Sequence, residues 1–143
     1  MFLVLSIACG GAETTPPDIQ VELNSKKLLS LRVTLRSRAE TRVNVVKWRL
    51  PWGDGNPSMI LVAVTPGKEY IVRSIPEEYP SYERVPFEPN GSRSGDVSLD
   101  KYFTGLDAAL KKSDIHLFWA YEAPKELHIA RWSGGWILIP QNH

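Results

Sequence analysis

Hydrophobic and polar residues alternate over much of the chain, which is the pattern of strands that bury one face. In residues 29–35, leucine or valine occupies every second position. Residues 19–23 alternate in the same way, so we expect them to pair with 29–35. Residues 43–50 form another alternating segment, which Pro51 ends because its nitrogen has no proton to donate to a neighbouring strand. Each segment predicts a strand with one face on a core.

Further along the chain, more continuous apolar segments indicate strands that are buried more deeply. Residues 59–64 are all apolar, and the turn sequence at 65–68 should bring residues 69–73 back as a hairpin. Residues 94–99 predict another strand. Residues 115–121 are apolar on both faces, which predicts a strand in the centre of a sheet.

Helical patterns are rare, and the last segment of the chain reads as a hairpin. The one helical candidate lies within 99–112, where Asp107 precedes two lysines, as a helix dipole favours. At the C-terminus, strands over 127–132 and 136–139 are expected, joined by a turn at Ser133-Gly134-Gly135.

These elements predict an all-β protein, an antiparallel immunoglobulin-like β-sandwich of about eight or nine strands with one short helix. A small β-barrel is the alternative. The chain has 143 residues, of which 43% are hydrophobic and 23% charged, so residues 19–143 should form a single globular domain. The net charge of +1 provides no general attraction to nucleic acid, and we expect no nucleic-acid partner.

The start of the chain combines a short apolar segment with the only cysteine. Residues 2–8 are apolar except for one serine, Cys9 follows them, and residues 10–18 are small or polar and include two prolines. Signal segments have an apolar core and small residues at the cleavage point, as Ala8 would be here. No lysine or arginine precedes the apolar segment, which suggests a start site further upstream. The alternative is an ordinary N-terminus with a buried cysteine.

Residues 5–9, Leu-Ser-Ile-Ala-Cys, resemble the lipobox of bacterial lipoproteins, although Ser6 stands where that pattern has leucine. The resemblance implies a signal in residues 1–8, a lipidated Cys9, and a tether over residues 9–18. It places the protein in the periplasm or at the cell surface, held to a bacterial membrane, and the glycines after Cys9 favour the outer membrane.

A second resemblance covers about residues 28–121. The segment 43–48 leads into Leu50 and Pro51, and residues 85–99 are followed by Tyr102 and Phe103. This order is similar to the N-terminal β-sandwich of deuterolysin-type aspzincin metallopeptidases, and to small immunoglobulin-like lipoproteins of Gram-negative bacteria. The first likeness implies a peptidase-associated domain, such as an inhibitor or a pro-domain. The sequence contains no His-Glu-x-x-His motif, so no zinc ligand is carried over.

Candidate chemistry is sparse. His116, His128 and His143 lack the spacing of metal ligands, and the Asp54-Gly55-Asn56 turn is not followed by the further oxygen ligands of a calcium loop. Residues 91–95 have arginine where a nucleophile elbow has serine. We therefore expect no catalytic residues, no metal and no cofactor.

Positive charge is concentrated between residues 24 and 50, which contain eight basic residues and one acidic residue, Glu40. Such a segment could contact phospholipid head groups or an acidic polymer. The alternative is the solvated outer face of ordinary strands. The basic residues are Lys26, Lys27, Arg32, Arg36, Arg38, Arg42, Lys47 and Arg49.

Aromatic residues are the strongest indication of a binding surface, since the chain has five tryptophans. Trp48 and Trp119 lie inside predicted strands and are expected in the core. The others lie at or beside turns, where an aromatic ring can contact a protein, peptide or glycan; the alternative is that they anchor those turns. The sequence thus suggests an envelope-anchored, non-catalytic binding or accessory module. Its candidate binding patch consists of Trp52, Tyr79, Tyr82, Trp132 and Trp136.

Overall fold

The computed structural model describes residues 16–27, 29–53, 58–74 and 81–142. The predicted signal segment 1–8, Cys9 and Tyr79 lie outside these residues, as do most of the predicted tether and the 54–57 turn. The described elements are β1 (Ile19–Leu23), β2 (Ser30–Arg36), β3 (Val43–Val46), η1 (Lys47–Arg49), β4 (Met59–Val64), β5 (Arg84–Phe87), β6 (Ser92–Ser98), α1 (Leu99–Tyr102), α2 (Leu106–Leu110), β7 (Ile115–Glu122), η2 (Lys125–Leu127) and β8 (Trp132–Ile139).

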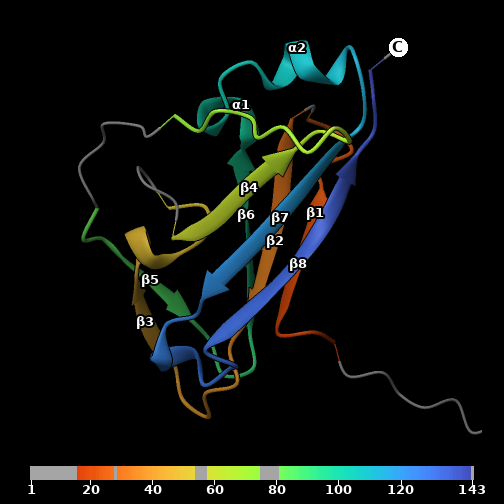
Figure 1. Cartoon of the computed structure of the whole chain (residues 1–143). Coiled ribbons are helices and arrows are strands. Elements are labelled where there is room, and N and C mark those ends of the chain that lie inside the picture. The colour runs from red at the N-terminus through yellow and green to blue at the C-terminus, as the bar shows by residue number, and fades with distance from the viewer. Residues whose placement is uncertain (1–15, 28, 54–57, 75–80, 143) are drawn as a thin grey trace, which may run out of the picture.

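Two antiparallel three-stranded sheets form the two layers of a β-sandwich (Figure 1). One sheet has the order β1-β2-β6 and the other the order β4-β7-β8, while β3 and β5 form a separate pair. By their place in the chain, the two three-strand orders correspond to A-B-E and C-F-G of an immunoglobulin-like fold, with β3 and β5 as an additional pair. The predicted fold class is confirmed.

The sheet β1-β2-β6 follows the predicted alternation closely. Leu31, Val33 and Leu35 are buried on one face of β2, while Arg32 between them is exposed. The register places Val21 of β1 opposite Val33, as expected for neighbouring strands. The leucine and valine spacing therefore fixes which face of β2 meets the other sheet.

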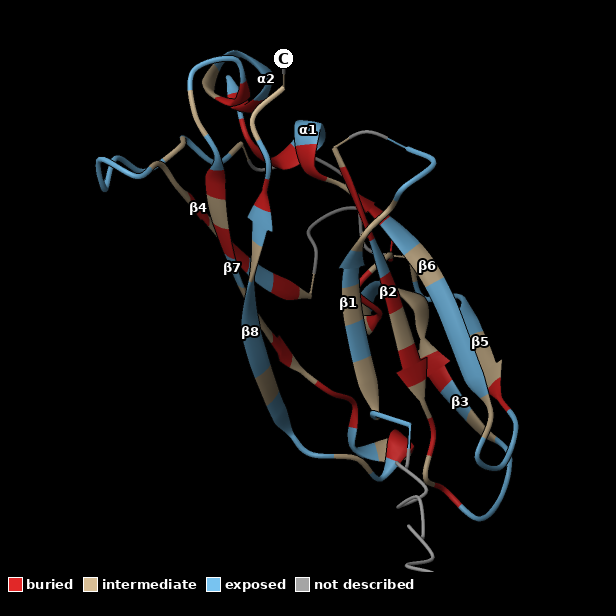
Figure 2. Ribbon diagram, turned by 90° about the vertical axis from the view of Figure 1, so that its right-hand side faces the viewer, coloured by how far each residue is buried: buried red, intermediate tan, exposed pale blue. Residues whose placement is uncertain are grey.

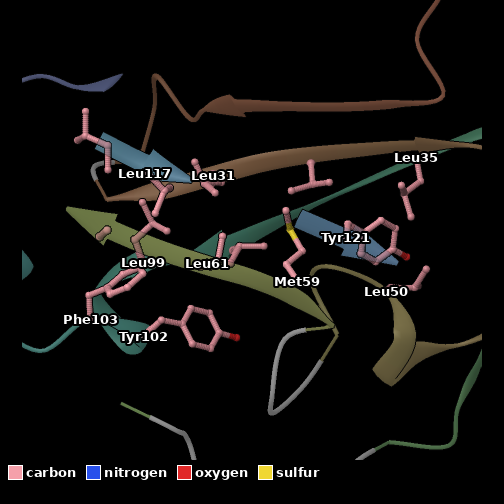
Figure 3. Packing of buried hydrophobic residues seen from close by; sticks show 14 of the residues in the cluster. Leu31, Leu35, Leu50, Met59, Leu61, Leu99, Tyr102, Phe103, Leu117 and Tyr121 are labelled. Carbon is pink, nitrogen blue, oxygen red and sulfur yellow. The ribbon is translucent and has the colours of Figure 1, made fainter. Parts of the chain in front are cut away.

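The core lies between the two layers and is closed at one end by the helical segment (Figures 2 and 3). Leu31 of β2 lies near Leu117 of β7, and Leu35 of β2 lies at the other end of the core, near Tyr121 of β7. Leu99 of α1 joins them, with Tyr102 and Phe103 beside it. The predicted helix is realised as two short helices, α1 and α2, which cover this end of the core.

β7 is central in its sheet, as predicted from its two apolar faces: it pairs with β4 on one side and β8 on the other. The predicted hairpin after β4 is present but short. Ile71 donates its N–H to the carbonyl oxygen of Ala63 at 3.0 Å, and Val64 bridges to Tyr70. The chain then leaves β4, since the N–H of Ser74 donates to the carbonyl oxygen of Tyr102 at 2.7 Å.

The predicted C-terminal hairpin is wrong. β8 runs without a break from Trp132 to Ile139, through the glycines that were expected to form a turn. The glycines instead make room for Trp119: a Cβ atom added at Gly135 would lie 3.2 Å from the indole Nε1 atom. Pairing along the whole of β7 therefore overrides the local turn preference.

The predicted core position of Trp48 is also wrong. The strand ends at Val46 and the chain turns through η1, where the Leu50 N–H bonds to the Lys47 carbonyl oxygen at 3.0 Å. This turn buries Leu50 completely and leaves Trp48 39% exposed. Trp119, by contrast, packs against the core as expected, although it is only partly buried.

Candidate functional site

The outer surface of the sheet β4-β7-β8 is apolar and open to solvent. The inward residues of β4 and most of those of β7 are buried, and those of β8 range from buried to exposed. The residues between them are exposed or half-buried. We call their apolar members the apolar face. It consists of Ile60, Val62 and Val64 of β4, Phe118 and Ala120 of β7, and Trp132, Trp136 and Leu138 of β8.

Strand register aligns the largest of these side chains in one row across the sheet. Val62 lies opposite Phe118, and Phe118 lies opposite Trp136. Phe118 is 47% exposed and Trp136 is 61% exposed. Directly opposite side chains on one face of an antiparallel sheet are close enough to touch. The row therefore presents a continuous apolar strip. The His116 ring, from the neighbouring row, meets the Trp136 ring edge-on, with 5.6 Å between centroids.

The next row contains one large side chain, that of Ile60, and two small residues. Ile60 lies opposite Ala120, and Ala120 lies opposite Gly134. On β8, Gly134 separates Trp132 from Trp136, so both indoles stand beside exposed main chain. Two aromatic rings with small residues between them suit a partner with its own apolar groups.

Charged groups are confined to one end of the apolar face. Glu122 lies opposite Trp132 and accepts a 2.8 Å hydrogen bond from Nε of Arg131. The same carboxylate lies 2.8 Å from Nη2 of Arg131, so its charge is balanced locally. This end offers charged contacts, while the rest of the face is apolar apart from His116, which lies between Val64 and Leu138.

The five predicted patch residues fall in different places. Trp132 and Trp136 lie together on the apolar face. Tyr82 is 76% exposed but precedes β5, which belongs to another sheet. Trp52 is partly buried against the core, where its ring lies directly over Gly95 of β6. Tyr79 lies outside the described residues.

The sequence reasoning missed six of the eight members of this surface, among them its large side chains Ile60, Phe118 and Leu138. Each lies in a segment that is apolar on both faces, which was interpreted as burial. Hydrophobicity alone cannot separate a covered face from an exposed one. The sequence signal that could have revealed the exposed face is its extent. The outward positions are mostly apolar in all three neighbouring strands, so the cluster extends over the whole sheet.

The basic segment between residues 24 and 50 is largely paired with carboxylates. The separations range from 2.5 Å for Arg38–Asp18 to 3.8 Å for Arg49–Glu126. This segment is therefore not a uniformly positive surface. The remaining pairs are Arg32–Asp96, Arg42–Glu88 and Lys47–Glu83.

Groups with catalytic potential do not converge on the apolar face. Tyr121 points inward, is 1% exposed and donates to the carbonyl oxygen of Arg49 at 3.0 Å; its burial raises the pKa of the hydroxyl. Within the described ranges, no three His, Cys, Asp or Glu side chains gather as a metal site would need. Nor does any helix in those ranges have the length and apolarity to cross a membrane.

An open hollow of about 510 Å³ lies elsewhere, between the 65–67 turn and α2. Its charged side chains are Glu69 and Lys112, and most of its lining residues are small.

The chain matches no family model and no curated protein. The apolar face is therefore the surface from which function has to be inferred.

Proposed function

We propose that the protein is a non-catalytic binding module of the bacterial cell envelope, which holds a protein, peptide or glycan partner on the apolar face. The observation that carries this proposal is the row of Val62, Phe118 and Trp136, in which both aromatic rings are exposed. Contiguous apolar patches on soluble domains mark interaction sites, and tryptophan contributes strongly to binding energy. The face combines both properties on a rigid sheet.

Anchoring through a lipidated Cys9 forms the second part of the proposal. The described chain begins beside β1, where Nη2 of Arg38 donates to the Pro16 carbonyl oxygen at 3.2 Å. The N–H of Arg36 donates to the Asp18 carbonyl oxygen at 2.8 Å. These contacts fix where a tether would join the domain. β1 and β8 begin at the same end of the sandwich, so Trp132 lies nearer to that end than Leu138 does (Figures 1 and 2).

Occupancy of the apolar face can be tested by hydroxyl-radical footprinting of the full chain, in intact bacterial cells and after purification. We expect Trp132 and Trp136 to be oxidised less in cells, because a partner covers their rings. Tyr82 is exposed but lies off the face, so its oxidation should be unchanged. Equal oxidation of the two tryptophans in both states would contradict the proposal.

The anchor is tested separately by growing bacteria that express the protein with an alkyne fatty acid. The chain has one cysteine, so C9S provides a matched control. Label should appear on the wild-type protein in the membrane fraction and be absent from C9S. An unlabelled wild-type protein in the soluble fraction would remove the envelope anchor and leave the binding face to be judged by footprinting.

A further inference from the structure

β8 is an edge strand whose outer edge carries none of the usual protection. It pairs with β7 on one side only. In the described part of the chain, no hydrogen bond outside the β7–β8 ladder involves the backbone of Trp132–Ile139. Native edge strands are normally shielded by charged residues, proline or bulges. The eight residues of β8 contain no charged side chain and no proline.

The middle of this edge is open main chain. Gly134 and Gly135 are both exposed, and a glycine can be exposed only through its backbone. Glycine within a strand often marks a place where another backbone approaches closely. The edge is therefore accessible at its centre, where a pairing strand would begin to bond.

The other edges are less suited to pairing. The edge of β4 is already used by the bridge from Val64 to Tyr70. β6 carries the charged side chains of Arg93 and Asp96, and Arg93 bonds to the carbonyl oxygen of Pro86 on β5. β1 is short and carries Glu22. Among the described edges of the two main sheets, β8 is the longest strand without a charged side chain, and β1 of the other sheet lies close to it.

We propose that β8 pairs with β8 of a second copy of this chain, in antiparallel orientation about a two-fold axis. The result is one continuous six-stranded sheet whose two apolar faces lie side by side. The pairing is argued from the edge of β8 and not from the proposed function, although it covers part of the Trp132 and Trp136 rings. Closed two-fold pairing also removes the open edge, so it ends at two copies.

The sequence of β8 fits such a pairing with itself. Outward residues must lie opposite outward residues, which restricts the register to steps of two. With Gly135 opposite Gly135 of the second copy, Trp136 lies opposite Gly134 and Trp132 lies opposite Leu138. Each indole then meets a small or aliphatic side chain, and no like charges are brought together.

The available area predicts a weak dimer. A fully enclosed aromatic side chain buries about 150–250 Å². The exposed parts of two indoles thus supply about 200 Å² on each copy, to which Leu138 and the backbone add. A stable interface needs about 1,000 Å² in total, so pairing should be concentration-dependent in solution. A membrane tether would favour it by raising the local concentration.

The test uses the full chain with the C9S substitution, studied by sedimentation velocity over a range of concentrations. We expect a reversible monomer–dimer equilibrium that is lost in L138K, because the lysine would lie against Trp132 of the second copy. I60K is the matched control: Ile60 is 50% exposed and Leu138 is 43% exposed, and both belong to the same face. Ile60 lies on β4, away from the proposed contact, so I60K should still form dimers. Circular dichroism and thermal unfolding show whether both variants are folded.

The register is tested by cross-linking in the same background. The pair W132C with L138C should form a disulfide-linked dimer on oxidation, because these positions lie opposite each other across the axis. W132C alone should not. A wild-type monomer at all concentrations would overturn the pairing while leaving footprinting of the apolar face unaffected. Equal loss of dimer in I60K and L138K would also overturn it, because the copies would then meet through their faces.

Discussion

The two main sheets have similar inner faces and opposite outer faces. On the central strands, Val33 of β2 and Leu117 of β7 are both fully buried. The outward neighbour of Val33 is Thr34, whereas the outward neighbour of Leu117 is Phe118, which is 47% exposed. Folding requires one apolar face from each sheet and places no such demand on the second face.

The polar outer face is satisfied by its own cross-strand pairs. The hydroxyl groups of Thr34 and Ser94 lie 2.7 Å apart, and Nε of Arg32 lies 3.2 Å from Asp96. Nδ2 of Asn24 donates to the same carboxylate at 3.2 Å. The apolar face has no comparable internal partners. The apolar face is therefore not needed for packing of the two sheets, which supports the proposal that it holds a partner.

The sharpest test of this difference is a pair of truncations on β7. L117A should lower the free energy of unfolding by about 2–5 kcal/mol, because it leaves a cavity between the sheets. F118A should lower it by only about 1 kcal/mol, because the ring is already half in water. Both are measured by urea unfolding. Y82A serves as control, since Tyr82 is 76% exposed and should lose almost nothing. Equal losses in L117A and F118A would mean that Phe118 belongs to the core.

The next largest loss of stability is expected where Trp52 packs, because this residue lies partly buried against the core and not in a binding patch. A methyl group at Gly95 would overlap the Trp52 ring. G95A should therefore destabilise the protein by about 1–3 kcal/mol through overpacking. G67A is the control, since its nearest neighbour would be the Thr65 hydroxyl at 3.8 Å. If thermal unfolding of G95A matched that of the wild type, Trp52 would be free to leave the core.

Alternation predicted the fold well where the two faces of a strand differ. The 19–23 and 29–35 pair was found as expected, because polar residues marked its solvent side. Residues 115–121 are apolar on both sides, so their pattern identified a central strand but not which face was open. That information depends on what covers the sheet, and local sequence does not contain it.

Errors arose where tertiary contacts overruled local preference. Ser133-Gly134-Gly135 has the composition of a turn. It forms part of β8 instead, because β7 pairs with it and because the Trp119 ring fits only where Gly135 has no side chain. Trp48 lies in an alternating segment, but the chain turns to bury Leu50 instead. Of the predicted patch, Trp132 and Trp136 were placed together by the register of β8, which the sequence reasoning had divided into two strands.

Unfolding at alkaline pH tests the inner face of β7, through the buried hydroxyl of Tyr121. Burial raises its pKa above the ordinary tyrosine value of 10.0, so the folded state holds the proton more tightly than the unfolded state does. Stability from this group is intact below pH 10.0 and falls as the pH rises further, because only the unfolded chain then releases the proton. Y121F should lower the free energy of unfolding by about 1 kcal/mol at neutral pH. Between about pH 9 and about pH 11.5, the variant should lose less stability than the wild type does. Parallel urea midpoints for wild type and Y121F over this range would contradict the assignment.

The smallest effect is expected on the polar outer face, where Arg32 and Asp96 are both partly exposed. R32M keeps much of the apolar stem and removes the charge, so we expect a loss below about 1 kcal/mol that shrinks as salt is added. D96N should lower the free energy of unfolding more than R32M does, because Asp96 also accepts a hydrogen bond from Asn24. A double-mutant cycle by urea unfolding separates the pair from its surroundings. A large, salt-independent coupling would mean that the polar face is a structural element, and the two outer faces would then differ in stability as well as in solvation.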